Sequence, residues 1–239
     1  DKNTRKYDGA PTSSDPNKLT VETTATSNIS LGDSSTGMYL INAETVTNAT
    51  GSQITSTTGA TKNVGIYAIN GQDSVAANNK TLTMTTATNI TLGNGSVGLY
   101  SKGQSSTIRN TVTNTGNITV GDNAVGIYGY GVNNTGNITA GSQGTAIYSQ
   151  GGNINVTSGT ITLGQNSAVG VYTAGTGQNV NIANGVAMNI GNGSFGFANV
   201  GQGNHITSNI NSVDLNGNSI YIYSRDNAGT VDNHTKLIA

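Results

Sequence analysis

The chain alternates apolar and polar residues in short stretches that return along its whole length. The clearest stretch reads Asn-Ile-Thr-Leu-Gly, then a few small polar residues, then Val-Gly-Ile-Tyr. Copies begin at Asn28, Asn89, Asn117 and Asn137, and a shorter one begins at Ile161. Alternation with period two is the pattern of a half-buried β-strand, and similarity at a recurring interval is the signature of a solenoid.

Each copy closes on an aromatic residue, and these residues set the length of the repeat. The closing positions are Tyr39, Tyr67, Tyr100, Tyr128, Tyr148, Tyr172, Phe197 and Tyr221. Their separations run from 20 residues (Tyr128 to Tyr148) to 33 residues (Tyr67 to Tyr100), which fits a turn of about three short strands. The sequence therefore predicts an all-β fold, a right-handed parallel β-helix (β-solenoid) with about eight rungs of 20–33 residues. With rungs about 4.8 Å apart, the rod is roughly 38 Å long.

The alternation also predicts which residues face the core. Ile90, Ile118, Ile138 and Ile161 are expected to form one interior file, since successive side chains of a strand point to opposite faces. No stretch shows the spacing of an amphipathic helix, so we expect essentially no helix.

The same rule applied to the second half of the repeat gives its two faces. Val97 and Leu99 are expected to point inward, and Gly98 and Tyr100 outward. The glycine after each leucine is expected to provide the positive φ of a corner. Asparagines before the isoleucines predict an amide ladder along another corner, formed by Asn28, Asn89, Asn117, Asn137 and Asn189.

The tyrosines form the most distinctive predicted surface. If the alternation holds, an outward stripe runs along the rod, formed by Tyr39, Tyr67, Tyr100, Tyr128, Tyr148 and Tyr172. One interpretation is an aromatic surface that binds a glycan or a protein. The other is a stacking ladder that stabilises the coil.

Charge and proline divide the chain. Many charged residues and both prolines, Pro11 and Pro16, lie near its start. Residues 1–17 therefore read as a leader or N-terminal cap, and residues 18–239 as the repeat array. The early spacings are the longest, so residues 43–62 and 71–80 are expected to be inserted loops and the preferred place for specific contacts.

Composition excludes several function classes. Charged residues are 9% of the chain and the net charge is −1, so no electrostatic field gathers nucleic acid. No apolar run is long enough for a transmembrane helix, so we expect no membrane insertion by this segment. There is no cysteine, which removes disulfides and thiolate metal sites, and we expect no cofactor.

Enzymes built on β-solenoids need cooperating carboxylates. Asp33 and Asp122 are expected at the same corner but three rungs apart, about 14 Å by the rung spacing. Asp214, Asp226 and Asp232 lie near one another in sequence and are expected to be solvated in loops at the end of the rod.

His205 and His234 have no partner at metal-ligand spacing and are expected to be exposed to solvent. We therefore expect no enzyme, with a glycan-degrading β-helix enzyme as the alternative. An ice-binding face requires a Thr-x-Thr motif on the same face of every rung, and the sequence shows this motif in one rung, around Thr83.

The motif Asn-Ile-Thr-x-Gly-x-x-x-x-Gly-Ile-Tyr, preceded by Asn-Thr-Gly at residues 114–116, resembles autotransporter (type V secretion) passenger domains. It is most similar to the large fusobacterial adhesins of the RadD type, over about residues 18–224. The resemblance implies a virulence-associated adhesin on the bacterial cell surface (outer membrane, exposed passenger) or secreted. Its partner would be a host-cell or bacterial surface protein or glycan, and self-association is possible. An inert structural spacer remains the other alternative.

Overall fold

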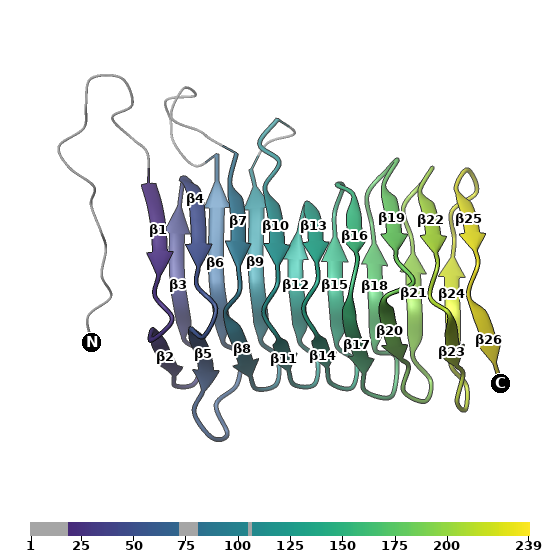
Figure 1. Ribbon diagram of the computed structural model, residues 1–239, viewed down its shortest axis with the longest axis horizontal. Coiled ribbons are helices and arrows are strands. Elements are labelled where there is room, and N and C mark those ends of the chain that lie inside the picture. Colours follow the sequence, from purple (N-terminus) through teal and green to yellow (C-terminus); the bar gives the residue numbers. More distant parts are fainter. Residues whose placement is uncertain (1–18, 72–80, 105–106) are drawn as a thin grey trace.

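The computed structural model describes residues 19–71, 81–104 and 107–239, and in these ranges the chain forms strands and no helix. The strands belong to parallel sheets that run the length of a rod (Figure 1). Successive turns add strands to three sheets, which we call A, B and C; the 8 strands of sheet C mark successive turns, and sheet B has 7 strands. The predicted parallel β-solenoid is confirmed. The predicted leader, residues 1–17, lies outside the described residues.

The strands are short and each sheet takes every third one. Sheet A consists of β1 (Leu19–Thr23), β4 (Ala43–Asn48), β7 (Thr83–Thr86), β10 (Thr111–Asn114), β13 (Gly131–Asn134), β16 (Ile154–Val156), β19 (Asn179–Ile182), β22 (His205–Ser208) and β25 (Thr230–Asn233). Sheet B consists of β2 (Asn28–Leu31), β5 (Gln53–Ser56), β8 (Asn89–Leu92), β11 (Ile118–Val120), β14 (Ile138–Ala140), β17 (Gly159–Leu163) and β20 (Val186–Asn189). Sheet C consists of β3 (Thr36–Ile41), β6 (Val64–Asn70), β9 (Val97–Gly103), β12 (Val125–Gly129), β15 (Thr145–Ser149), β18 (Val169–Thr173), β21 (Phe195–Asn199) and β24 (Ile220–Ser224). A separate pair is formed by β23 (Ser212–Asp214) and β26 (Lys236–Ile238).

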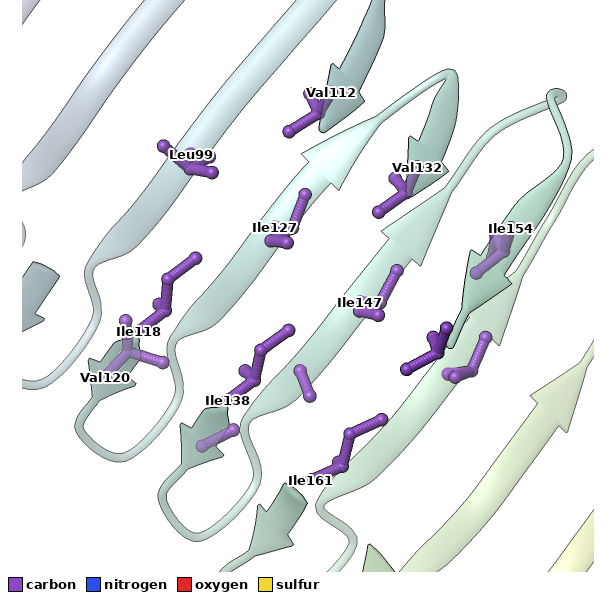
Figure 2. Packing of buried hydrophobic residues seen from close by; sticks show 14 of the residues in the cluster. Leu99, Val112, Ile118, Val120, Ile127, Val132, Ile138, Ile147, Ile154 and Ile161 are labelled. Carbon is purple, nitrogen blue, oxygen red and sulfur yellow. The ribbon is translucent and has the colours of Figure 1, made fainter. Parts of the chain in front are cut away.

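The core is a set of aliphatic files, one per sheet. In sheet B, Ile118 lies between Ile90 and Ile138, and Ile161 follows Ile138, so the predicted interior file is confirmed. Figure 2 shows these files side by side, with Ile118, Ile138 and Ile161 in one and Leu99, Ile127 and Ile147 in another. Full burial of one such side chain contributes about 1.5–3 kcal/mol, so the rod depends on these files.

The strict alternation predicted for sheet C is wrong at its first residues. Val97 is half-buried, whereas Gly98 and Leu99 are both buried. A Cβ atom on Gly98 would lie 2.9 Å from the core atom Ile118 Cγ2 and 2.5 Å from the carbonyl oxygen of Gly126. Gly98 therefore faces inward, and glycine is required because the next turn passes too close for a side chain.

The predicted role of the glycine that follows each leucine is also wrong. At the corner between sheets B and C, positive φ occurs later, at Ser34 (φ 54), Asn123 (φ 54) and Gln143 (φ 57). A Cβ atom on Gly121 would lie 2.7 Å from the backbone nitrogen of Asn94 in the preceding turn. This glycine thus allows two turns to approach closely.

The predicted amide ladder exists only from Asn89 to Asn137, because Gln53 lies between Asn28 and Asn89. The Asn89 side chain accepts from the backbone N–H of Asn117 at 3.1 Å, and Nδ2 of Asn137 donates to Oδ1 of Asn117 at 3.0 Å. Asn189 does not belong to this ladder, because it pairs with Thr162, two positions further along the strand.

The expected early insertion at residues 43–62 is wrong as well. Half of this range forms β4 and β5, which pair with their neighbours in sheets A and B. The other expected insertion, residues 71–80, lies outside the described residues except for Gly71.

The sheets show one interruption among the described strands. Sheets A and C continue from β19 to β22 and from β21 to β24, but β20 has no ladder to β23. Sheet B therefore stops at β20, and the strand of the next turn pairs with β26 instead.

Ile118→Asp tests the core. Ile118 is 1% exposed, so the substitution places an unpaired charge between two isoleucines. We expect the free energy of unfolding to fall by at least about 3 kcal/mol in urea titrations followed by circular dichroism. Thr119→Asp on the outer face is the matched control and should leave the unfolding midpoint nearly unchanged. Similar midpoints for both variants would contradict the assigned interior.

Candidate functional site

The six tyrosines predicted as a stripe form a continuous stack on the outside of sheet C. Successive ring centroids lie 5.1, 4.7, 4.6, 5.0 and 4.9 Å apart, and the angles between neighbouring ring planes rise from 3° to 12°. The ladder, which we call the tyrosine ladder, consists of Tyr39, Tyr67, Tyr100, Tyr128, Tyr148 and Tyr172. Each stacked aromatic pair contributes about 0.5–1.5 kcal/mol beyond its buried area, so the predicted structural role is supported.

The ladder also remains accessible to a ligand. Tyr39 is 58% exposed, and the other five tyrosines are half-buried. Because each ring covers the face of the next, a ligand meets mainly ring edges and hydroxyl groups. Tyrosine presents apolar area and a hydrogen-bonding tip together, which is why it is enriched at binding surfaces.

The surroundings of the ladder are neutral. The strands of sheet C contain one charged residue, Lys102 in β9. Half-buried valines begin four of these strands, at Val64, Val97, Val125 and Val169. Sheet C is therefore a nearly uncharged face along which the tyrosines form a continuous row of polar groups.

The ladder ends at Tyr172, the last tyrosine of the predicted stripe, and the two later closing aromatics do not continue it. Phe197 pairs with Val171 and is 1% exposed, so it belongs to the core file. Tyr221 is also buried, and its hydroxyl bonds to Ser208 at 2.5 Å. The positions in line with the ladder are Ala198 and then Tyr223. Phe197 and Tyr221, which close the last two copies of the repeat, are therefore out of register with the ladder and lie in the core.

Neighbouring rings change the acidity of the ladder. Burial, together with the nearby Tyr100 and Tyr148, raises the pKa of Tyr128 to about 12. Burial likewise raises the pKa values of Tyr100 and Tyr148. These raised pKa values keep Tyr100, Tyr128 and Tyr148 uncharged over the physiological range.

The aspartates at the corners accept hydrogen bonds from backbone N–H groups of the following turn. Asp33 accepts from the hydroxyl and the backbone N–H of Thr61, each at 2.8 Å, and these bonds lower the pKa of Asp33. Asp122 accepts from the backbone N–H of Ser142 at 2.8 Å. As predicted, the two carboxylates occupy the same corner of different turns, where each joins its own turn to the next.

The C-terminal aspartates are spread over different faces. Asp226 accepts from the backbone N–H groups of Asn204, Ala228 and Gly203; desolvation opposes them, yet together they hold the pKa of Asp226 well below its usual range. It is therefore a structural group and not merely a solvated one. Asp232 lies 3.2 Å from His205 on sheet A, while Asp214 lies on β23. Within the described ranges no three His, Asp or Glu side chains form a metal site.

Both histidines form polar contacts with residues of a neighbouring turn. His234 is exposed, as predicted, and its Nδ1 lies 2.8 Å from the Asn209 side chain. His205 is half-buried and also contacts the hydroxyl of Thr230. Both side chains join neighbouring turns.

Threonines recur in register more often than the sequence suggested. On the outer face of sheet A, one column runs over four turns, through Thr20, Thr45, Thr83 and Thr111, and beside it a second runs over three, through Thr47, Thr85 and Thr113. The second column continues as asparagines whose amides bond to one another, with Asn155 Nδ2 donating to Asn133 Oδ1 at 2.9 Å. The Thr-x-Thr array therefore covers only part of the sheet.

The second feature with space for a ligand is the interruption of sheet B, which the sequence did not reveal. A groove of about 310 Å³ opens between β20 and β23. Its outer wall carries Asn189, Ser212, Asp214 and Asn216. No short motif marks these residues, since each occupies an ordinary strand or turn position.

Comparison with known proteins returned no matching family model, no similar curated protein and no similar solved structure. The class that the structure defines is a parallel β-solenoid with an exposed tyrosine ladder.

The raised pKa of Tyr128 gives a pH prediction. The native state keeps its phenolic proton up to about pH 12, whereas an unfolded tyrosine loses it near 10. Unfolding therefore releases a proton between these values, and stability should fall as pH rises through this window. Urea titrations at pH 9 to 11 should show this decline, and it should be smaller for Tyr128→Phe. An equal decline in both proteins would contradict the assignment.

Proposed function

We propose that this solenoid is a shaft segment of a bacterial cell-surface adhesin, of the autotransporter passenger type, and that it contacts its partner through the tyrosine ladder. The observation that carries the proposal is the continuous row of six accessible tyrosines on a nearly uncharged face. A rod of this kind holds a long surface at a distance from its anchor. The repeat motif that resembles the adhesin passengers supports the same interpretation.

The chemistry of the face fits contact with another surface. Fully desolvated tyrosines are among the residues that dominate binding energy at interfaces, and few charges need to be desolvated on sheet C. A flat row of ring edges and hydroxyl groups can engage a protein strand or an extended glycan along several turns. The partner that we propose is therefore a protein or glycan on a host cell or on another bacterium.

Placement of the carboxylates favours this proposal over glycan degradation. Glycosidases of the common type need two carboxyl groups that flank one bond, between about 5 and 9.5 Å apart. Asp33 and Asp122 receive backbone hydrogen bonds at the same corner of turns that are three apart, and Asp226 receives them at another corner. Release of reducing ends from acidic polysaccharides by the purified chain would support the enzyme instead.

Beads coated with the purified chain test the proposal. They should adhere to epithelial cells or to partner bacteria, and the double variant Tyr100→Thr with Tyr128→Thr should weaken adhesion by about tenfold or more. Tyr100→Phe with Tyr128→Phe keeps the stack and loses the hydroxyl groups, which separates ring contact from hydrogen bonding. Tyr223→Thr is the matched control, because Tyr223 lies on the same sheet but outside the stack.

Melting curves must accompany the adhesion assay. The threonine variants lose ring stacking, so their binding is interpreted at temperatures where they stay folded. Adhesion that is equal in all variants would exclude the ladder as the contact surface. Beads that adhere to neither cell type would contradict the adhesin and favour an inert spacer.

A further inference from the structure

The interruption of sheet B creates a groove in a molecule whose neighbouring turns are otherwise held by ladders on each side. The corners that flank it remain closed, since Asn209 N–H donates to the Ile182 carbonyl at 2.9 Å and Ile220 N–H donates to the Ser194 carbonyl at 2.9 Å. Between these two bonds, β20 and β23 share no ladder. The groove is thus a local opening with fixed ends. Its volume of about 310 Å³ is at the low end for small-molecule sites, so it has room for one ring-sized molecule.

The groove has a polar wall and an apolar floor. Leu163, Met188 and Ile190 form the floor and are almost fully buried, while Ala187 adds an apolar edge. The polar wall combines a carboxylate (Asp214), two amides (Asn189 and Asn216) and a hydroxyl (Ser212). The exposed lining is therefore mainly polar, which fits a ligand rich in hydroxyl groups.

Asp214 differs from the other described aspartates because its carboxylate forms no hydrogen bond or ion pair with another described residue. Asp33, Asp122 and Asp226 accept backbone hydrogen bonds, and Asp232 contacts His205. Among the described residues, no hydrogen bond or ion pair joins the side chain of Asp214, Ser212 or Asn216 to another side chain or to the backbone. The Asp214 carboxylate is exposed at the rim of the groove and is therefore available for a ligand.

We propose that the groove between β20 and β23 binds one sugar ring of a neutral glycan. The Asp214 carboxylate accepts hydrogen bonds from two sugar hydroxyl groups, and the amides of Asn189 and Asn216 both donate and accept. The apolar floor contacts the C–H face of the ring. This inference rests on the proposed adhesin function and names the ligand class of a second contact point on the same rod.

The charge of the lining selects against other ligands. Asp214 repels acidic sugars and phosphates at close range. Calcium takes six to eight oxygen ligands, and one carboxylate with two amides and a hydroxyl falls short of that number. An extended peptide is too long for a groove that closes at both ends. A neutral ring with several hydroxyl groups satisfies both the wall and the floor.

Saturation-transfer NMR with the purified chain tests the proposal. The probes are the methyl glycosides of galactose, glucose, mannose, N-acetylgalactosamine and N-acetylglucosamine. At least one should receive saturation, and Asp214→Asn should weaken its binding by about tenfold or more. Asp232→Asn is the matched control, because it removes the same charge from an exposed position on sheet A, outside the groove lining.

Each outcome decides between the two proposals. If no neutral glycoside binds, or if binding persists in Asp214→Asn, the groove proposal is overturned while bead adhesion through the tyrosine ladder can still stand. If a glycoside binds in an Asp214-dependent manner but coated beads adhere to no cell, the groove is a sugar site and the adhesin function fails. Equal melting temperatures for the two aspartate variants exclude unfolding as the cause of lost binding.

Discussion

In-register parallel stacking is the constraint on which the rest of this structure depends. Each residue has as its axial neighbours the residues at the same position one turn before and one turn after, about 4.8 Å away. A side chain is therefore favoured where it packs well on a copy of itself. Isoleucine does so in the core, tyrosine on sheet C and asparagine on sheet B, and all three form continuous columns. The same rule explains why Asp33 and Asp122 reach the backbone of the following turn.

Much of the fold could be predicted because in-register stacking requires similar residues to recur at similar intervals along the sequence. The file through Ile118 and the ladder through Tyr128 follow from matching each copy to the next. The errors have two physical causes. Asn189 was misplaced because a shift of two residues keeps every side chain on its face, so alternation cannot detect it. Phe197 was matched to the closing tyrosines but lies one residue before the position in line with the ladder, and a shift of one residue moves a side chain from the surface to the core.

The candidate sites differ in how far the sequence could reveal them. The tyrosine ladder was predictable, because six matching positions in a periodic chain must lie in line. The groove was not, because it depends on a ladder that fails to form between β20 and β23. Ser212, Val213 and Asp214 alternate like any other strand. Whether the carboxylate of Asp214 has a hydrogen-bond partner depends on the side chains and backbone of the neighbouring turns, which the sequence does not place. Gly98 shows the same limit: its inward position follows from the path of the neighbouring backbone at Gly126.

Two consecutive turns of this rod are interchangeable, and this has a consequence for how its length can change. β10 to β12 and β13 to β15 match position for position, from Thr111 against Gly131 through Ile118 against Ile138 to Tyr128 against Tyr148. Excision of one such unit brings chemically equivalent residues together at the new junction, with core and surface columns still aligned. Recombination between repeats can therefore shorten or lengthen the molecule by whole turns without building a new packing interface. The length of the rod can therefore change in evolution by whole turns, independently of what its surface binds.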